Sequence, residues 1–233
     1  IAIAGTHGKS TTSAWIAYLL EKGGLSPSFI IGASAAQLEG SSGVGTGRVF
    51  VAEACEYDRS FLNLYPKIGV ILNIELDHLD YYRDEEEIVD AFTDFARGIR
   101  RGGILITSGQ DKNTARLMRR LHNGIQIHTF GRTEACEFSA ARIELIDGLY
   151  EFDLCRGGSC LGRTKISIPG LHNIDNALAA SATAIASGLS PDTVLRHLGG
   201  FTGIDRRLMF KSCIHGITIL DDYAHHPTEV RAS

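Results

Sequence analysis

The residues with the clearest chemical potential lie near the start of the chain, in the segment IAIAGTHGKSTT. Its apolar run breaks at Gly5, and Gly5 and Gly8 allow a tight turn whose backbone N–H groups point into a concavity where a helix begins. Lys9 could reach the β- and γ-phosphate oxygens of a nucleotide, and a hydroxyl of Ser10 or Thr11 could coordinate Mg²⁺. The segment therefore predicts a site for a nucleoside triphosphate.

The match to the general phosphate-loop pattern is only partial. That pattern, G-x-x-x-x-G-K-[ST], requires a glycine five residues before Gly8, where this sequence has Ile3. The alternative interpretation is an ordinary glycine turn between a strand and a helix. We favour the nucleotide loop because a strand, a lysine and paired hydroxyls coincide here.

Acidic residues follow two further apolar runs. Glu53 ends the run RVFVAEA and is followed by Glu56 and Asp58, whereas the run IGVILNI leads into ELDHLD, which contains His78. In open α/β sheets ligands bind at the carboxyl ends of the strands, so Glu53 could approach a metal held by the phosphate loop, and His78 could be a metal ligand. A solvated carboxylate and a structural histidine are the simpler alternatives.

Composition limits the classes of partner. The 233 residues are 44% apolar and 21% charged, which suits one large α/β domain or one domain plus a fragment. A formal net charge of −4 gives no general attraction to nucleic acid or anionic lipid, and no apolar stretch is long enough to predict membrane insertion. Five cysteines without a C-x-x-C pair indicate reduced thiols and a cytoplasmic protein.

The apolar patterns predict a doubly wound, mainly parallel sheet. Strands are expected over residues 1–4, 28–31, 48–54, 68–74, 104–107 and 126–130, and helices over 9–21, 85–97, 112–122, 171–187 and 190–197. The stretch 32–47, rich in Gly, Ser and Ala, predicts a mobile loop near the site. Strand-like segments at 138–146, 149–155 and 163–168 predict a small antiparallel β-meander packed beside the main sheet, and 211–213 with 217–220 predict a hairpin.

Five separated motifs together resemble the Mur ligase family. They are the loop AGTHGKST, the long stretch VAEACEYDRSFLNLYPKIGVILNIELDHLDYY, and the patterns G-x-H-N-x-x-N-A, F-x-G-x-x-R-R and D-D-Y-[GA]-H-H-P at residues 170–177, 201–207 and 221–227. Cys55 stands where the family commonly has aspartate. Other members hold a second metal with a carbamoylated lysine, but no lysine occurs here between Lys67 and Lys112, which favours the alanine-adding type.

The resemblance implies an ATP-dependent ligase. Such an enzyme joins L-alanine to the lactyl carboxylate of UDP-N-acetylmuramic acid through an acyl phosphate, in peptidoglycan biosynthesis. It also implies that residues 1–208 form a central ATP-binding domain, that 209–233 begin a C-terminal domain, and that an N-terminal UDP-binding domain lies outside the chain. The alternatives are a ligase that recycles murein tripeptide onto the same nucleotide sugar and a switch that hydrolyses ATP without forming a bond.

The resemblance also implies roles for individual residues. Lys9, Glu53 and His78 would be catalytic, with Ser10 and Glu53 on one Mg²⁺ and His78 on a second. ATP contacts are implied for Gly5, Thr6, His7, Gly8, Lys9, Ser10, Thr11, His172, Asn173, Asn176, Arg206 and Asp222, and substrate contacts for Arg207, Tyr223 and His225.

The later motifs also have simpler interpretations. Asn173 or its neighbours could cap a helix, since His172 and Asn176 lie one turn apart at its start. The two arginines could form a solvated surface pair, and Asp222 could stabilise a turn.

Overall fold

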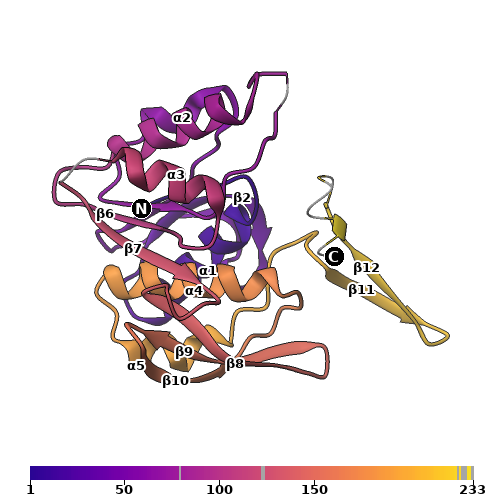
Figure 1. Ribbon diagram of the computed structural model, residues 1–233. Helices are drawn as coiled ribbons and strands as arrows, with labels where there is room; N and C mark the ends of the chain where they lie inside the picture. The colour runs from indigo at the N-terminus through magenta and orange to yellow at the C-terminus, as the bar shows by residue number, and fades with distance from the viewer. Residues whose placement is uncertain (79, 122–123, 225, 227–229, 232–233) are drawn as a thin grey trace.

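The molecule is built on one ten-stranded sheet (Figure 1). The computed structural model describes residues 1–78, 80–121, 124–224, 226 and 230–231. The strand order is β10-β9-β8-β7-β6-β5-β1-β4-β2-β3. The strands are β1 Ala2–Ala4, β2 Ser28–Ala35, β3 Gly40–Gly43, β4 Phe50–Glu53, β5 Ile68–Ile71, β6 Ile104–Ser108, β7 Gln126–Gly131, β8 Phe138–Ile146, β9 Leu149–Arg156 and β10 Ser159–Lys165. The strands β2, β4, β1, β5, β6, β7 and β8 pair in parallel, which confirms the predicted fold class.

Helices cover both faces of the sheet. The α-helices are α1 Lys9–Lys22, α2 Glu85–Arg97, α3 Lys112–Arg120, α4 His172–Ala186 and α5 Pro191–Leu198, and the 3₁₀ segments are η1 Ala36–Leu38 and η2 Tyr57–Asn63. Helices α1, α4 and α5 pack on one face, and α2 and α3 pack on the other (Figure 1). In the part of the chain that the structure describes, no helix is both long and apolar enough to cross a membrane.

Strand β1 lies between two apolar cores. Successive side chains of a strand point to opposite faces, so Ile3 joins the core under α1 and α4, whereas Ala2 and Ala4 join the core under α2. All three side chains are buried. The phosphate-loop candidate thus begins at the end of a buried strand, which pairs with β4 and β5 and has an apolar core on each face.

The predicted loop at residues 32–47 is wrong. Strand β2 continues to Ala35, and β3 pairs with it in antiparallel register, for example Phe29 with Gly43. A Cβ on Gly43 would lie 2.5 Å from Cε1 of Phe29, so the small residue lets the ring cover this edge strand. Gly, Ser and Ala carry little of the apolar alternation by which a strand is recognised, which is why the pattern failed.

The antiparallel meander is part of the main sheet and does not pack beside it. Strand β8 pairs in parallel with β7, through Phe130 with Phe138 and Gly131 with Ser139, and β9 and β10 extend the same sheet. Several boundaries also differ: β5 ends at Ile71, and β10 runs from Ser159 to Lys165.

A separate two-stranded sheet follows the last helix. Strands β11 Met209–Ile214 and β12 Ile217–Asp221 form the predicted hairpin, which projects from the main body (Figure 1). The chain leaves the main sheet at Asp205, whose backbone N–H donates to the Ser34 carbonyl at 2.8 Å.

Candidate functional site

A cavity of about 1010 Å³ lies at the carboxyl ends of β1, β4 and β5. It is lined by the loop before α1, the segments after β4 and β5, the start of α4, and residues 203–208 and 222–223. Most of the predicted site residues contribute to its wall: Thr6, His7, Gly8, Lys9, Ser10, Thr11, Glu53, His78, His172, Asn173, Asn176, Arg206, Arg207, Asp222 and Tyr223. Gly5 lies behind the wall against Leu72, and His225 lies outside the described residues.

The loop turns through two glycines that other residues would strain. Gly5 has a φ of +146° and Gly8 a φ of +82°, in the range that favours glycine. A Cβ on Gly8 would lie 2.6 Å from Oδ1 of Asn176, and one on Gly5 would lie 2.9 Å from Cβ of Leu72. The loop therefore follows its path because α4 and the segment after β5 approach its backbone closely.

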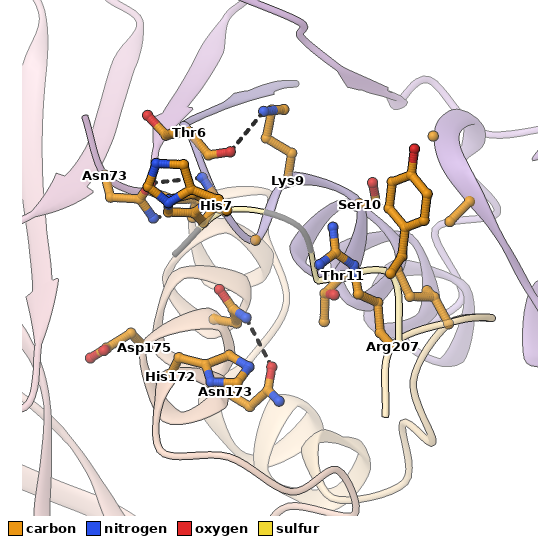
Figure 2. Close-up of a pocket in the computed structure, with 18 of the residues that line it drawn as sticks. Thr6, His7, Lys9, Ser10, Thr11, Asn73, His172, Asn173, Asp175 and Arg207 are labelled. Carbon is orange, nitrogen blue, oxygen red and sulfur yellow. Dashed lines mark hydrogen bonds between the residues drawn. The ribbon is translucent and has the colours of Figure 1, made fainter. Parts of the chain in front are cut away.

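Residues after β5 fix the loop by hydrogen bonds. The His7 backbone N–H donates to Oδ1 of Asn73 at 2.8 Å, and Nδ2 of Asn73 donates to the His7 carbonyl at 3.1 Å (Figure 2). The Thr6 hydroxyl accepts from the Glu75 N–H at 2.9 Å and donates to the Glu75 carbonyl at 3.2 Å. Asn73 thus supports the phosphate-loop candidate, a role that its sequence motif did not reveal.

Lys9 is charge-compensated within the protein. Its Nζ donates to the carbonyls of Gly5 at 2.6 Å and Thr6 at 3.1 Å and to Oε1 of Glu56 at 2.9 Å (Figure 2 shows the bond to Thr6). The Glu56 side chain is 0% exposed and that of Lys9 is 15% exposed, so this ion pair is largely shielded from water. The Lys9 side chain therefore folds back onto its own loop.

Glu56 is the functional candidate that sequence reasoning did not select. Its Oε1 lies 3.8 Å from Nε2 of His78, and its backbone carbonyl accepts from the Tyr82 hydroxyl at 2.6 Å. Burial raises the pKa of Tyr82, which keeps this phenol a hydrogen-bond donor. No sequence pattern predicts burial of an acid three residues beyond the end of a strand. Its position close to Glu53 in the sequence was the one signal that could have pointed to the site.

Glu53 faces the opposite side of the loop. Its Oε2 accepts from the Gly32 N–H at 2.6 Å, and a Cβ on Gly32 would lie 2.8 Å from that same oxygen. Gly32 therefore leaves the space that the carboxylate needs. Both Glu53 and Glu56 line the cavity, but only Glu56 contacts Lys9 among the contacts described.

His78 occupies a turn with left-handed backbone geometry. Its φ is +54°, and its N–H donates to Oδ1 of Asp77 at 2.7 Å. The His78 ring packs edge-on against the Tyr57 ring, with ring centroids 5.1 Å apart. The turn places the imidazole beside Glu56 and not in the apolar core. The imidazole therefore lies on the cavity wall, and its role as a metal ligand stays a prediction.

The donor set on this wall suits a hard cation. The hydroxyl of Ser10 and the carboxylate of Glu53 are oxygen ligands of the kind that Mg²⁺ prefers. In addition, Oε2 of Glu56 is buried and accepts no hydrogen bond from the described residues, although Lys9 Nζ lies 2.9 Å away. A buried carboxylate oxygen of this kind is better compensated when a further cation is close.

The start of α4 carries an asparagine pair that joins two helices. Nδ2 of Asn176 donates to Oδ1 of Asn173 at 2.9 Å (Figure 2). The Thr12 hydroxyl donates to Oδ1 of Asn176 at 3.2 Å. Nδ2 of Asn173 donates to the Pro169 carbonyl at 2.6 Å. Leu171 is the N-cap residue and makes no side-chain cap bond, so the expectation of capping by Asn173 is wrong.

An acid–arginine pair lies beside these asparagines. Oδ1 of Asp175 lies 3.2 Å from Nε of Arg132, and both residues line the cavity. Burial raises the pKa of the Asp175 carboxyl, although the arginine acts in the opposite direction. This pair adds a polar patch to the wall next to His172 (Figure 2).

The two arginines after α5 are organised by an aromatic ring. The guanidinium carbon of Arg206 lies 4.7 Å from the ring centroid of Tyr223, and that of Arg207 lies 5.9 Å from it. Arg206 is exposed and Arg207 is partly buried, so the simpler interpretation of a solvated surface position holds for Arg206. Asp222 accepts from the N–H groups of Leu208 at 3.0 Å and Ala224 at 2.7 Å, so it does stabilise the turn as the simpler interpretation expected.

The Lys9–Glu56 pair can be tested with Glu56→Gln. We expect the variant to lose about 2 kcal/mol of stability, less than the roughly 3–5 kcal/mol of a wholly buried pair, because Lys9 keeps two carbonyl acceptors. Phosphate anions should replace the missing carboxylate, so Mg²⁺-ATP should raise the melting temperature of the variant more than that of the parent chain. Differential scanning fluorimetry measures both, with Glu21→Gln on α1 as the control. Equal shifts in all three proteins would contradict the pairing argument.

Comparison with known proteins places these features in a family. The Mur ligase middle domain profile matches residues 3–184. The chain is 42% identical over its whole length to UDP-N-acetylmuramate--L-alanine ligases of Alkaliphilus metalliredigens and Caldicellulosiruptor bescii, of which it covers 50% and 51%. It therefore spans about half the length of these curated relatives.

Solved structures agree with the sequence comparison. The UDP-N-acetylmuramate-alanine ligase of Thermotoga maritima superposes with a TM-score of 0.85 at 28% identity, over all of this chain and 52% of that one. The UDP-N-acetylmuramate:L-alanyl-gamma-D-glutamyl-meso-diaminopimelate ligase of Neisseria meningitides superposes with a TM-score of 0.80 at 30% identity, over 88% of this chain and 67% of that one. The chain belongs to the Mur ligase family, whose middle domain it contains.

Proposed function

We propose that this chain is the ATP-binding part of a ligase that joins L-alanine to the lactyl carboxylate of UDP-N-acetylmuramic acid. The observation that carries the proposal is the glycine loop with Lys9 at the carboxyl end of β1, in one cavity with Glu53, Glu56 and His78. The chain is 42% identical over its whole length to two UDP-N-acetylmuramate--L-alanine ligases, which supports this choice of substrates. This proposal assigns the protein to the cytoplasm, where ATP is available.

The reaction requires activation of a carboxylate. A carboxylate does not expel an oxide ion, so the γ-phosphoryl group of ATP passes to it, and the amine of alanine then displaces phosphate from the acyl phosphate. The protein contributes positioning and charge compensation. In this scheme the N–H groups of the loop hold the phosphates. Lys9 would give up its hydrogen bonds to Glu56 and the two carbonyls and bond phosphate oxygens instead.

Ser10, Glu53 and His78 would hold Mg²⁺ ions on the same wall. When bound, the metal would neutralise charge on the transferred phosphoryl group. The buried oxygen of Glu56 and its closeness to His78 support a cation in this region.

The rest of the cavity offers places for the remaining groups. The start of α4, with His172, Asn173 and Asn176, is proposed to contact the base of ATP, and Arg207 with Tyr223 to approach the substrate from the other side. Arg206 and Asp222 would complete the ATP contacts on that side. His225 is proposed for the substrate as well.

The proposed domain division is supported by the two separate sheets. We assign residues 1–208 to the central ATP-binding domain and 209–233 to the start of a C-terminal domain. The ten-stranded sheet with its helices and the separate β11–β12 hairpin support this boundary.

Lys9 must be tested in a background that does not leave Glu56 unpaired. Lys9→Ala alone would orphan a fully buried carboxylate and lower stability. In a Glu56→Gln background, we expect Lys9→Ala to weaken Mg²⁺-ATP binding roughly 10- to 100-fold, the value of one or two lost charged hydrogen bonds. Isothermal titration calorimetry measures it, with Lys22→Ala at the end of α1 as the control. Unchanged affinity would remove the loop from the nucleotide site.

The metal ligands can be separated by titration. We expect Glu53→Ala to raise the Mg²⁺ concentration needed for ATP binding by about tenfold, because one carboxylate ligand is lost. His78→Ala should change ATP binding less, since its ion is assigned to the transferred group. Fluorescent ATP binding at stepped Mg²⁺ concentrations measures this, with Glu21→Ala as the control. Superimposed titrations for all proteins would refute the metal assignment.

The acceptor can be identified in a chimera. We would replace the matched half of the Alkaliphilus metalliredigens ligase by this chain and supply ATP, UDP-N-acetylmuramic acid and either L-alanine or a murein tripeptide. We expect ADP release that depends on the sugar nucleotide and on alanine. Preference for the tripeptide would support the recycling ligase, the alternative for which the similarity to the Neisseria structure is relevant. Equal ATP hydrolysis without either substrate would support a switch.

A further inference from the structure

Three metal-binding side chains from distant segments meet at one edge of the cavity. They are His7 of the loop, Glu75 after β5, and His226 in the segment after β12. One ligand atom from each residue lies within 4.8 Å of the other two, and all three residues are partly buried. None of the three belongs to the proposed Mg²⁺ ligands.

The spacing fits a transition metal. Nε2 of His7 lies 3.5 Å from Oε2 of Glu75, whereas two ligands at about 2.1 Å on a tetrahedral Zn²⁺ lie about 3.4 Å apart. The rings of His7 and His226 have centroids 4.6 Å apart and are tilted by 46°, so they are not stacked face to face. Two imidazoles and one carboxylate with an open fourth position match a common zinc ligand set.

Two of the three ligands are held in place by their backbones. Asn73 bonds both backbone groups of His7, and the Thr6 hydroxyl bonds both backbone groups of Glu75. Such support lowers the ordering cost of metal binding. The third ligand arrives on the segment after the hairpin, so a bound ion would connect the phosphate loop to that segment.

We propose that His7, Glu75 and His226 form a site for a divalent transition metal such as Zn²⁺ or Co²⁺, separate from the Mg²⁺ site. A pair of imidazole nitrogens favours these ions over Mg²⁺, whose ligands are mainly oxygen atoms, whereas the Mg²⁺ ligands proposed above include one imidazole among oxygen donors. A bound ion would join His226 to His7 of the phosphate loop, and the site can be tested without nucleotide.

Cobalt binding tests the site in residues 1–233, because Co²⁺ reports its ligands by visible absorption. With Mg²⁺ in excess, we expect one equivalent of Co²⁺ and the absorption of nitrogen and oxygen ligands. His226→Ala and Glu75→Gln should each weaken binding by more than about tenfold. His215→Ala, in the turn between β11 and β12, should bind as the parent chain does. Zn²⁺ should raise the melting temperature of the parent chain and not that of His226→Ala.

Two rival sites are excluded in the same experiment. The Sγ atoms of Cys155 and Cys160 lie 3.0 Å apart and could bind the metal. Binding there would give a thiolate-to-cobalt charge-transfer band that is lost in Cys155→Ser. Loss of binding in His78→Ala would place the ion in the Mg²⁺ site. Either result, or unchanged binding in His226→Ala, would overturn the proposal. Melting curves without metal show that each variant is folded.

Discussion

The positive charge of Lys9 has to be neutralised in every state of this cavity. Glu56 and two loop carbonyls do so in the structure, in a setting nearly closed to water. In the proposed function, phosphate binding would therefore exchange one set of acceptors of Lys9 for another, and would not simply add an anion beside an uncompensated cation. The net gain in free energy is the difference between the two sets, which lets a strong charge interaction give moderate affinity and release of product.

The same constraint explains why the loop needs so many fixed neighbours. Its N–H groups can cradle phosphate only if the backbone keeps its shape when Lys9 moves. Asn73 and Thr6 hold the loop from the side of β5, and Asn176 presses against Gly8 from α4. Because α4 packs on α1 through buried side chains, the residues proposed for the base and those proposed for the phosphates belong to one rigid unit.

Local chemistry was predictable, and long-range contact was not. The glycines, Lys9 and the acid-rich ends of two strands stand out in sequence because turns, charges and apolar runs are local signals. The burial of Glu56 depends on Lys9, His78 and Tyr82 arriving from elsewhere, so no local pattern contains it. The β2–β3 pairing failed for a related reason, since small residues pack well at a sheet edge without any apolar periodicity.

The connection to the second sheet is bonded to segments on both of its sides. Asp205 is bonded to Ser34 of the main sheet, while the Arg206 carbonyl accepts from Tyr223 of the C-terminal segment. Next to these hydrogen bonds, Arg206 and Leu208 have φ values of +60° and +47°, which are uncommon for such residues. The ring of Tyr223 contacts the guanidinium groups of both Arg206 and Arg207, so both cations lie against the segment that follows the second sheet while they line the same cavity as the phosphate loop.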